Sequence, residues 1–148
     1  MPKFLYYPPR VVPYQYVWVN ITTASHWRLG ELEFYPDANL GGTKLTGTAI
    51  TSGGAGGASG NTAFAFDGNT NSDWTAAGST INQYLGLELS AASAVKSARI
   101  FTNSNSSNTP ATMEIRASNA APTFGTDGIQ IAILNSPTLN TWNNFTFA

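Results

Sequence analysis

Apolar and polar residues alternate along most of this chain with a period of two, which is typical of strands that bury one face. The first alternating run covers residues 16–21. Its aliphatic side chains fall on one side, and its aromatic and polar side chains fall on the other: Val17, Val19 and Ile21 against Tyr16, Trp18 and Asn20. This run predicts a strand with one buried and one exposed face.

Further alternating runs follow, bounded by Asn, Ser, Gly or Pro. Their apolar members are Leu32 and Phe34 (with Glu31, Glu33 and Tyr35 opposite), Leu85, Leu87 and Leu89, Ala98 and Ile100, Met113, Ile115 and Ala117, and Ile129, Ile131 and Ile133. A short strand is also expected within residues 43–51. Since no window has a sustained helical period, we predict an all-β chain. The expected fold is an antiparallel β-sandwich with no helix longer than about three turns.

Composition narrows the class of protein. With 148 residues the chain is long enough for one domain with a real core. Charged residues make up only 10% and the formal net charge is −1, which argues against a nucleic-acid or anionic-membrane partner. The chain has no Cys, no apolar run long enough to span a membrane, and no signal-peptide pattern at its start.

The first 15 residues read as an extended arm that precedes a domain of residues 16–148. Four prolines remove backbone donors and favour extended geometry. The arm is nevertheless rich in apolar side chains, namely Phe4, Leu5, Tyr6, Tyr7, Val11 and Val12. Two interpretations stay open: an arm folded on its own domain, or an arm docked on another subunit of an assembly.

Residues 63–74 form the most distinctive stretch. Asp67-Gly68 is a turn pair, because glycine tolerates positive φ and aspartate bonds its own downstream backbone. Oxygen-bearing side chains crowd the next residues, while Phe66 and Trp74 provide apolar ends. Such a turn is suited to holding a hard cation. The alternative is a solvated, Asx-rich turn without an ion.

The motif Ala-Phe-Asp-Gly-Asn-x-x-Ser-x-Trp resembles the signature loop of discoidin, or coagulation-factor C-type, domains of the galactose-binding-like superfamily. Residues 16–22 and 30–35 resemble the final two strands of those domains, although here they come first. Residues 142–148 resemble the strand that normally precedes that pair. The chain therefore resembles a circularly permuted discoidin domain of the kind found in phage structural proteins. One departure is Trp18, where the family often has Arg.

This resemblance implies a jelly-roll β-sandwich in which the first and last strands are neighbours, with residues 17–21 beside residues 145–147. It also implies a structural Ca²⁺ site. The ligands carried over are the side chains of Asp67, Ser72 and Glu31 and the carbonyls of Phe64, Asn69 and Gly30. An oxygen-only ligand set of mixed type suits Ca²⁺ better than zinc or copper.

The family binds ligands with loops at one end of the sandwich, where aromatic rings stack on sugars. Two clusters here fit that description: His26, Trp27 and Arg28, and Trp142 with Asn143. The alternative is that each cluster is partly buried loop packing.

One His and no Cys leave little for nucleophilic catalysis, so we expect no enzymatic activity. Two function classes follow. The first is a virion structural or decoration protein located on the particle, anchored through residues 1–15 to other virion proteins or to copies of itself. The alternative is a carbohydrate-binding adhesion module that recognises host-surface glycans.

Overall fold

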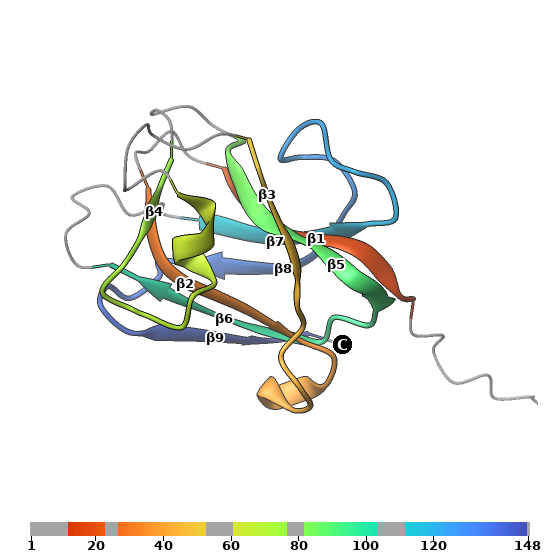
Figure 1. Ribbon diagram of the computed structural model, residues 1–148, viewed down its shortest axis with the longest axis horizontal. Coiled ribbons are helices and arrows are strands. Elements are labelled where there is room, and N and C mark those ends of the chain that lie inside the picture. The colour runs from red at the N-terminus through yellow and green to blue at the C-terminus, as the bar shows by residue number, and fades with distance from the viewer. Residues whose placement is uncertain (1–11, 23–26, 53–60, 77–81, 104–111, 148) are drawn as a thin grey trace, which may run out of the picture.

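The computed structural model describes residues 12–22, 27–52, 61–76, 82–103 and 112–147. Two antiparallel sheets pack face to face, which confirms the predicted β-sandwich (Figure 1). The strands are β1 (Tyr14–Ile21), β2 (Arg28–Tyr35), β3 (Gly47–Thr51), β4 (Trp74–Thr75), β5 (Tyr84–Ser93), β6 (Ser97–Thr102), β7 (Thr112–Ser118), β8 (Ile129–Asn135) and β9 (Trp142–Thr146). In this part of the chain the helices are two short 3₁₀ turns, η1 (Ala38–Leu40) and η3 (Thr62–Ala65). The prediction of no long helix is thus confirmed for the described residues.

The five-stranded sheet has the order β3-β5-β1-β7-β8, and the four-stranded sheet has the order β4-β2-β6-β9. The strand expected within residues 43–51 is β3, at the edge of the larger sheet. The sandwich begins at Tyr14, two residues before the predicted boundary.

The core lies between the sheets and uses the aliphatic positions that the alternation predicts. Leu85, Leu87 and Leu89 of β5 are buried, as are the inward residues of β6 and β7. Trp27 and Trp74 pack edge to face at one end of this core, with ring centroids 5.1 Å apart. Aromatic pairs of this geometry are favourable beyond the area they bury.

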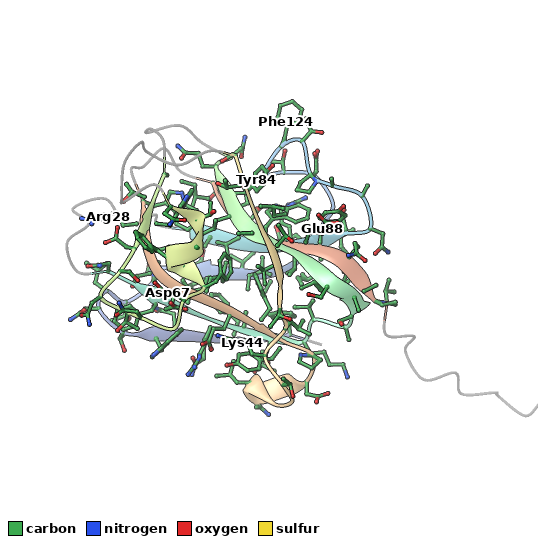
Figure 2. All side chains as sticks on the ribbon, viewed as in Figure 1. Arg28, Lys44, Asp67, Tyr84, Glu88 and Phe124 are labelled. Atoms are coloured by element: carbon green, nitrogen blue, oxygen red, sulfur yellow. The ribbon has the colours of Figure 1, made fainter. Side chains whose placement is uncertain are left out.

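The prediction that β1 exposes one face is wrong. Trp18 and Asn20, on the side expected to face solvent, are fully buried. Residues 119–128 fold across this outer face of the sheet, and the Trp18 indole Nε1 donates to the carbonyl of Gly125 at 2.9 Å. A Cβ placed on Gly128 would lie only 2.8 Å from the same ring. Figure 2 shows Phe124 at the tip of this segment, pointing away from the sandwich.

The prediction that Ile129, Ile131 and Ile133 share one buried face is also wrong. The pairing of β7 with β8 contains a register shift between Ile115 and Arg116, a β-bulge that changes the phase of the alternation. Ile129 and Ile133 therefore lie on opposite faces of β8, and they are 52% and 48% exposed.

The first and last strands are not neighbours in a sheet, which corrects a further prediction. β1 is flanked on both edges by β5 and β7, so it has no free edge for β9. β9 instead pairs with β6 at the edge of the four-stranded sheet.

The two ends of the described chain nevertheless meet at one end of the sandwich. Tyr14 pairs with Ser93 at the end of β5, and Thr146 pairs with Ser97 at the start of β6. The Phe147 N–H donates to the Lys96 carbonyl at 2.9 Å, beside the β5–β6 connection. In Figure 1 the start of β1 and the end of β9 both lie toward the right-hand side of the sandwich. We call this the terminal end.

Several connections open at the opposite end. The pairings place Ile21, Leu29, Thr102 and Asn135 at this end of their strands. The connections that begin and end there are residues 22–27, 76–83, 103–111 and 136–141. We call this the loop end.

Candidate functional site

The signature turn, residues 66–73, lies between η3 and β4 and folds through its own polar groups. Asp67 accepts a hydrogen bond from the Asn69 N–H at 2.7 Å with Oδ1. The Ser72 hydroxyl lies 2.8 Å from both Asp67 Oδ2 and the Asn69 carbonyl. Gly68 has a φ of +80°, a conformation that glycine adopts without strain. The local sequence thus explains the turn without any distant group.

Glu31 of β2 joins this turn from beneath. Its side chain is fully buried, and its Oε1 accepts from the Gly68 N–H at 2.7 Å and the Asn69 N–H at 3.0 Å. Gly30 lies equally close, because an added Cβ would come within 3.3 Å of the Thr70 carbonyl. The structure therefore brings together Glu31, Asp67, Asn69 and Ser72.

The electrostatics of this pair of carboxyl groups fit a cation. Glu31 Oε2 is buried and accepts no hydrogen bond from the described residues, and the only hydrogen bond open to it among them is to the Asp67 carboxylate, which requires Glu31 to be protonated. Burial, together with the neighbouring Asp67, raises the pKa of Glu31 to about 7. Burial opposes ionisation of Asp67 too, but hydrogen bonds from the Asn69 N–H and Ser72 outweigh it and lower its pKa. A divalent cation here would neutralise both carboxylates and give Oε2 a partner.

Neutral oxygens would complete such a site. Among the residues described, no group of three or more His, Cys, Asp or Glu side chains gathers to hold a metal. A cation would therefore rest on two carboxylates plus hydroxyl and carbonyl oxygens, a ligand set that Ca²⁺ accepts. The cation-free alternative also fits, because Glu31 Oε1 already satisfies two backbone N–H groups of the turn.

Two members of the first ligand cluster have structural partners. Trp27 is fully buried against Trp74, so its ring has no exposed face. Arg28 forms a bidentate pair with Asp73, at 3.0 Å from Nε and 2.6 Å from Nη2. Burial leaves Trp27 no ring face for a sugar, while Arg28 keeps a partly exposed side chain and stays a predicted ligand residue. His26 lies outside the described residues.

In the second cluster, Asn143 bonds the backbone and Trp142 packs against an arginine. The Asn143 amide donates to the Thr138 carbonyl at 2.9 Å and accepts from the Thr138 N–H at 2.8 Å. It therefore holds the β8–β9 connection, which favours the alternative interpretation of Asn143 as loop packing. Trp142 is half-buried on the outer face of the four-stranded sheet, where the Arg99 guanidinium lies 4.1 Å from its ring centroid.

A charged network that the sequence pattern did not predict lies on the same outer face of the four-stranded sheet. Glu33 is buried and accepts from Arg99, from the Tyr35 hydroxyl at 2.5 Å and from Lys44 at 3.4 Å. Burial favours the neutral acid, but the hydrogen bonds from Arg99 and Tyr35 prevail and lower the pKa of Glu33. The only signal in the sequence was the spacing of Glu31, Glu33 and Tyr35 on one face.

Most other acidic side chains also have structural partners. Asp73 pairs with Arg28, Glu114 with Arg116, and Glu88 with the Tyr16 hydroxyl, while Asp127 accepts from the backbone N–H groups of Thr123 and Phe124. These contacts give the carboxylates roles in holding the fold together.

Comparison with protein-family models, with curated proteins and with solved structures finds no significant match for this chain. Within the described residues, no helix has the length and apolar character needed to cross a membrane.

Proposed function

We propose that this chain is a non-enzymatic structural or decoration protein of a virus particle, anchored by its N-terminal arm. The observation that carries the proposal is the difference between the two ends of the sandwich. Both ends of the described chain lie at the terminal end, whereas the strand ends that flank residues 22–27, 76–83, 103–111 and 136–141 lie at the loop end, away from either chain end. A domain held at its terminal end would present those connections outward. The motifs that resemble permuted discoidin domains of phage proteins support the same class.

The junction between arm and sandwich is suited to transmitting an anchoring force. Gln15 donates from its backbone N–H to Asn119 at 2.9 Å and from its side chain to the Leu89 carbonyl at 2.6 Å. Asn119 in turn donates to the Pro13 carbonyl at 3.2 Å. The arm thus enters the central strand of the larger sheet through bonds to β5 and to Asn119, the residue that follows β7. Val12 is 47% exposed, and the other arm residues named above lie outside the described residues.

A chain lacking residues 1–11 should fold but fail to join the particle. This deletion keeps Pro13 and the bonds of Gln15, so the sandwich retains its junction. Tagged full-length chain and the deletion are supplied separately during particle assembly, and purified particles are then probed for the tag. We expect full-length chain in the particles and the deletion in the supernatant.

A matched control is Leu139→Lys, which alters an exposed residue of the β8–β9 connection at the loop end and should leave incorporation unchanged. Equal incorporation of the deletion would refute the arm as anchor. Particles that contain no full-length chain would refute the virion proposal itself.

We further propose that the signature turn holds a structural Ca²⁺ between Glu31 and Asp67. In chelator, Glu31 keeps its proton in the folded chain up to its raised pKa of about 7, whereas the unfolded chain loses that proton near the ordinary glutamate pKa of 4.5. The free energy of unfolding should therefore fall as pH rises through this interval. Adding Ca²⁺ at pH 8 should restore stability, by about 2.7 kcal/mol at a hundredfold excess over Kd. Thermal melts with chelator and with Ca²⁺ measure both effects.

Glu31→Gln is the control, because it keeps an acceptor for the turn but removes the charge. Its melting temperature should respond neither to Ca²⁺ nor, through this position, to pH. If wild-type protein melts at one temperature with chelator and with Ca²⁺, the turn is an Asx-rich turn without an ion.

The alternative proposal is a glycan-binding module. Among the described residues it would rest on Trp142 and the exposed Asn144 beside it, since Trp27, Arg28 and Asn143 have structural partners. Binding on a glycan array that is lost in Trp142→Ala would favour this alternative.

A further inference from the structure

Within the described residues, β8 is a sheet edge with a strand on one side only. It hydrogen-bonds to β7 on one side and is last in the order of the five-stranded sheet. Its seven residues include no charged residue and no proline. Natural sheets usually protect such an edge with charge, proline or a covering segment, because its free N–H and C=O groups pair readily with another strand.

The same strand carries exposed apolar side chains on both faces. Ile133 lies opposite Glu114 and Ile129 opposite Ala117, so they project to different sides. They are two of the five large hydrophobic residues that are exposed in the described structure. The other edge strands, β3, β4 and β9, carry none of the five. An added strand at β8 would therefore gain apolar contacts on each face as well as backbone hydrogen bonds.

We propose that the β8 edge receives residues 4–7 of a neighbouring copy of this chain as an added strand. The inference rests on the proposed function of the arm and names the surface that the arm binds. Residues 4–7 read Phe-Leu-Tyr-Tyr, an apolar run without proline, and Pro8-Pro9 then end the segment that can donate hydrogen bonds. Alternate side chains of such a strand would contact Ile129 on one face and Ile133 on the other.

The length of the arm and the place where it leaves the sandwich are compatible with binding at the β8 edge. Eleven residues precede Val12, and fully extended they span at most about 36–40 Å. The arm leaves beside Pro13, whose carbonyl is bound by Asn119, directly after β7. β8 begins at that same end, because Ile129 pairs with Ala117. The arm therefore leaves the molecule at the end where the acceptor strand starts.

Residues 8–13, which link residues 4–7 to the sandwich, favour pairing with β8 of a neighbouring copy over pairing with β8 of the same chain. Pairing with its own edge would require the chain to reverse direction within residues 8–13. Pro8, Pro9 and Pro13 occupy half of these positions and favour extended geometry. Because each copy has one arm and one acceptor edge, the contacts run head to tail and close into a ring or extend as a filament.

The test uses a fluorescein-labelled peptide of residues 1–11 and protein lacking those residues. We expect saturable binding by fluorescence anisotropy, weakened about tenfold or more by Ile133→Lys, which places a charge on the acceptor edge. Leu139→Lys is the matched control: it changes a 40% exposed leucine away from β8 and should bind like the parent. Sedimentation velocity of full-length protein should show oligomers that Ile133→Lys dissociates. Circular dichroism confirms that each variant is folded.

Cross-linking tells the two arrangements apart, since the chain has no native Cys. Leu5→Cys in one chain and Gln130→Cys in another should cross-link between chains after mixing. If the double variant cross-links only within one chain, or if full-length protein is monomeric at every concentration, the neighbouring-copy inference is overturned. If Ile133→Lys binds peptide as well as the parent, β8 is not the acceptor. That result leaves the anchoring function standing, which fails only if the deletion still enters particles.

Discussion

Replacing Glu31 with alanine should lower the free energy of unfolding by about 3 kcal/mol in chelator, the sum of an emptied buried site and two lost hydrogen bonds. The change leaves the N–H groups of Gly68 and Asn69 without their acceptor. It also detaches the signature turn from β2. For a domain of this size the melting temperature should fall by about 6–12 °C. Urea unfolding followed by circular dichroism measures the loss.

The matched control is Glu88→Ala. Glu88 is also on a strand, but it is exposed, and its hydrogen bond goes to the Tyr16 hydroxyl at the surface. Its loss should change the free energy of unfolding by less than about 0.5 kcal/mol. Equal effects of the two substitutions would show that Glu31 does not support the turn.

Replacing Trp18 with alanine should cost about 4 kcal/mol, in the range found for buried Trp and Phe residues. The indole is fully buried under residues 119–128 and donates to the Gly125 carbonyl. Without it, this covering segment loses its main apolar contact and should become a site of proteolytic cleavage. Urea unfolding and limited proteolysis, with the cut mapped by mass spectrometry, test both consequences.

Trp142→Ala provides the comparison for a tryptophan on the outer face of the other sheet. Trp142 is only half-buried and contacts Arg99 and Phe101, so its loss should cost about 1 kcal/mol. If Trp18→Ala is no more destabilising than Trp142→Ala, residues 119–128 do not depend on the Trp18 ring.

The assignment of β5, β6 and β7 from sequence succeeded because the predicted apolar residues of each strand fall at every second position and are buried, with no shift in this alternation from one to the next. β8 failed for the opposite reason. Its bulge opposite Arg116 arises in the pairing with β7, and the isoleucine spacing carries no trace of it. The burial of Trp18 was not predictable either, because the residues next to it in the sequence do not indicate that residues 119–128 will cover its ring.

Part of the candidate site was predictable from nearby residues, and part depended on the tertiary structure. The Asp67–Ser72 turn was predictable, because Asx and Ser hydrogen bonds reach only two to five residues along the chain. The position of Glu31 beneath it came from a resemblance, and only the folded chain shows its bonds to Gly68 and Asn69.

By itself, the sequence determined the all-β class, most strand positions and the shape of the signature turn, since each depends on neighbours within a few residues. The tertiary structure alone decided that β1 is a central strand between β5 and β7, so that β9 pairs elsewhere. It also decided that Trp27 and Asn143 serve the fold and that β8 is left as an open edge. Strand order and residual exposure depend on which distant segments compete for the same edge and face, and that competition is resolved only when the whole chain packs.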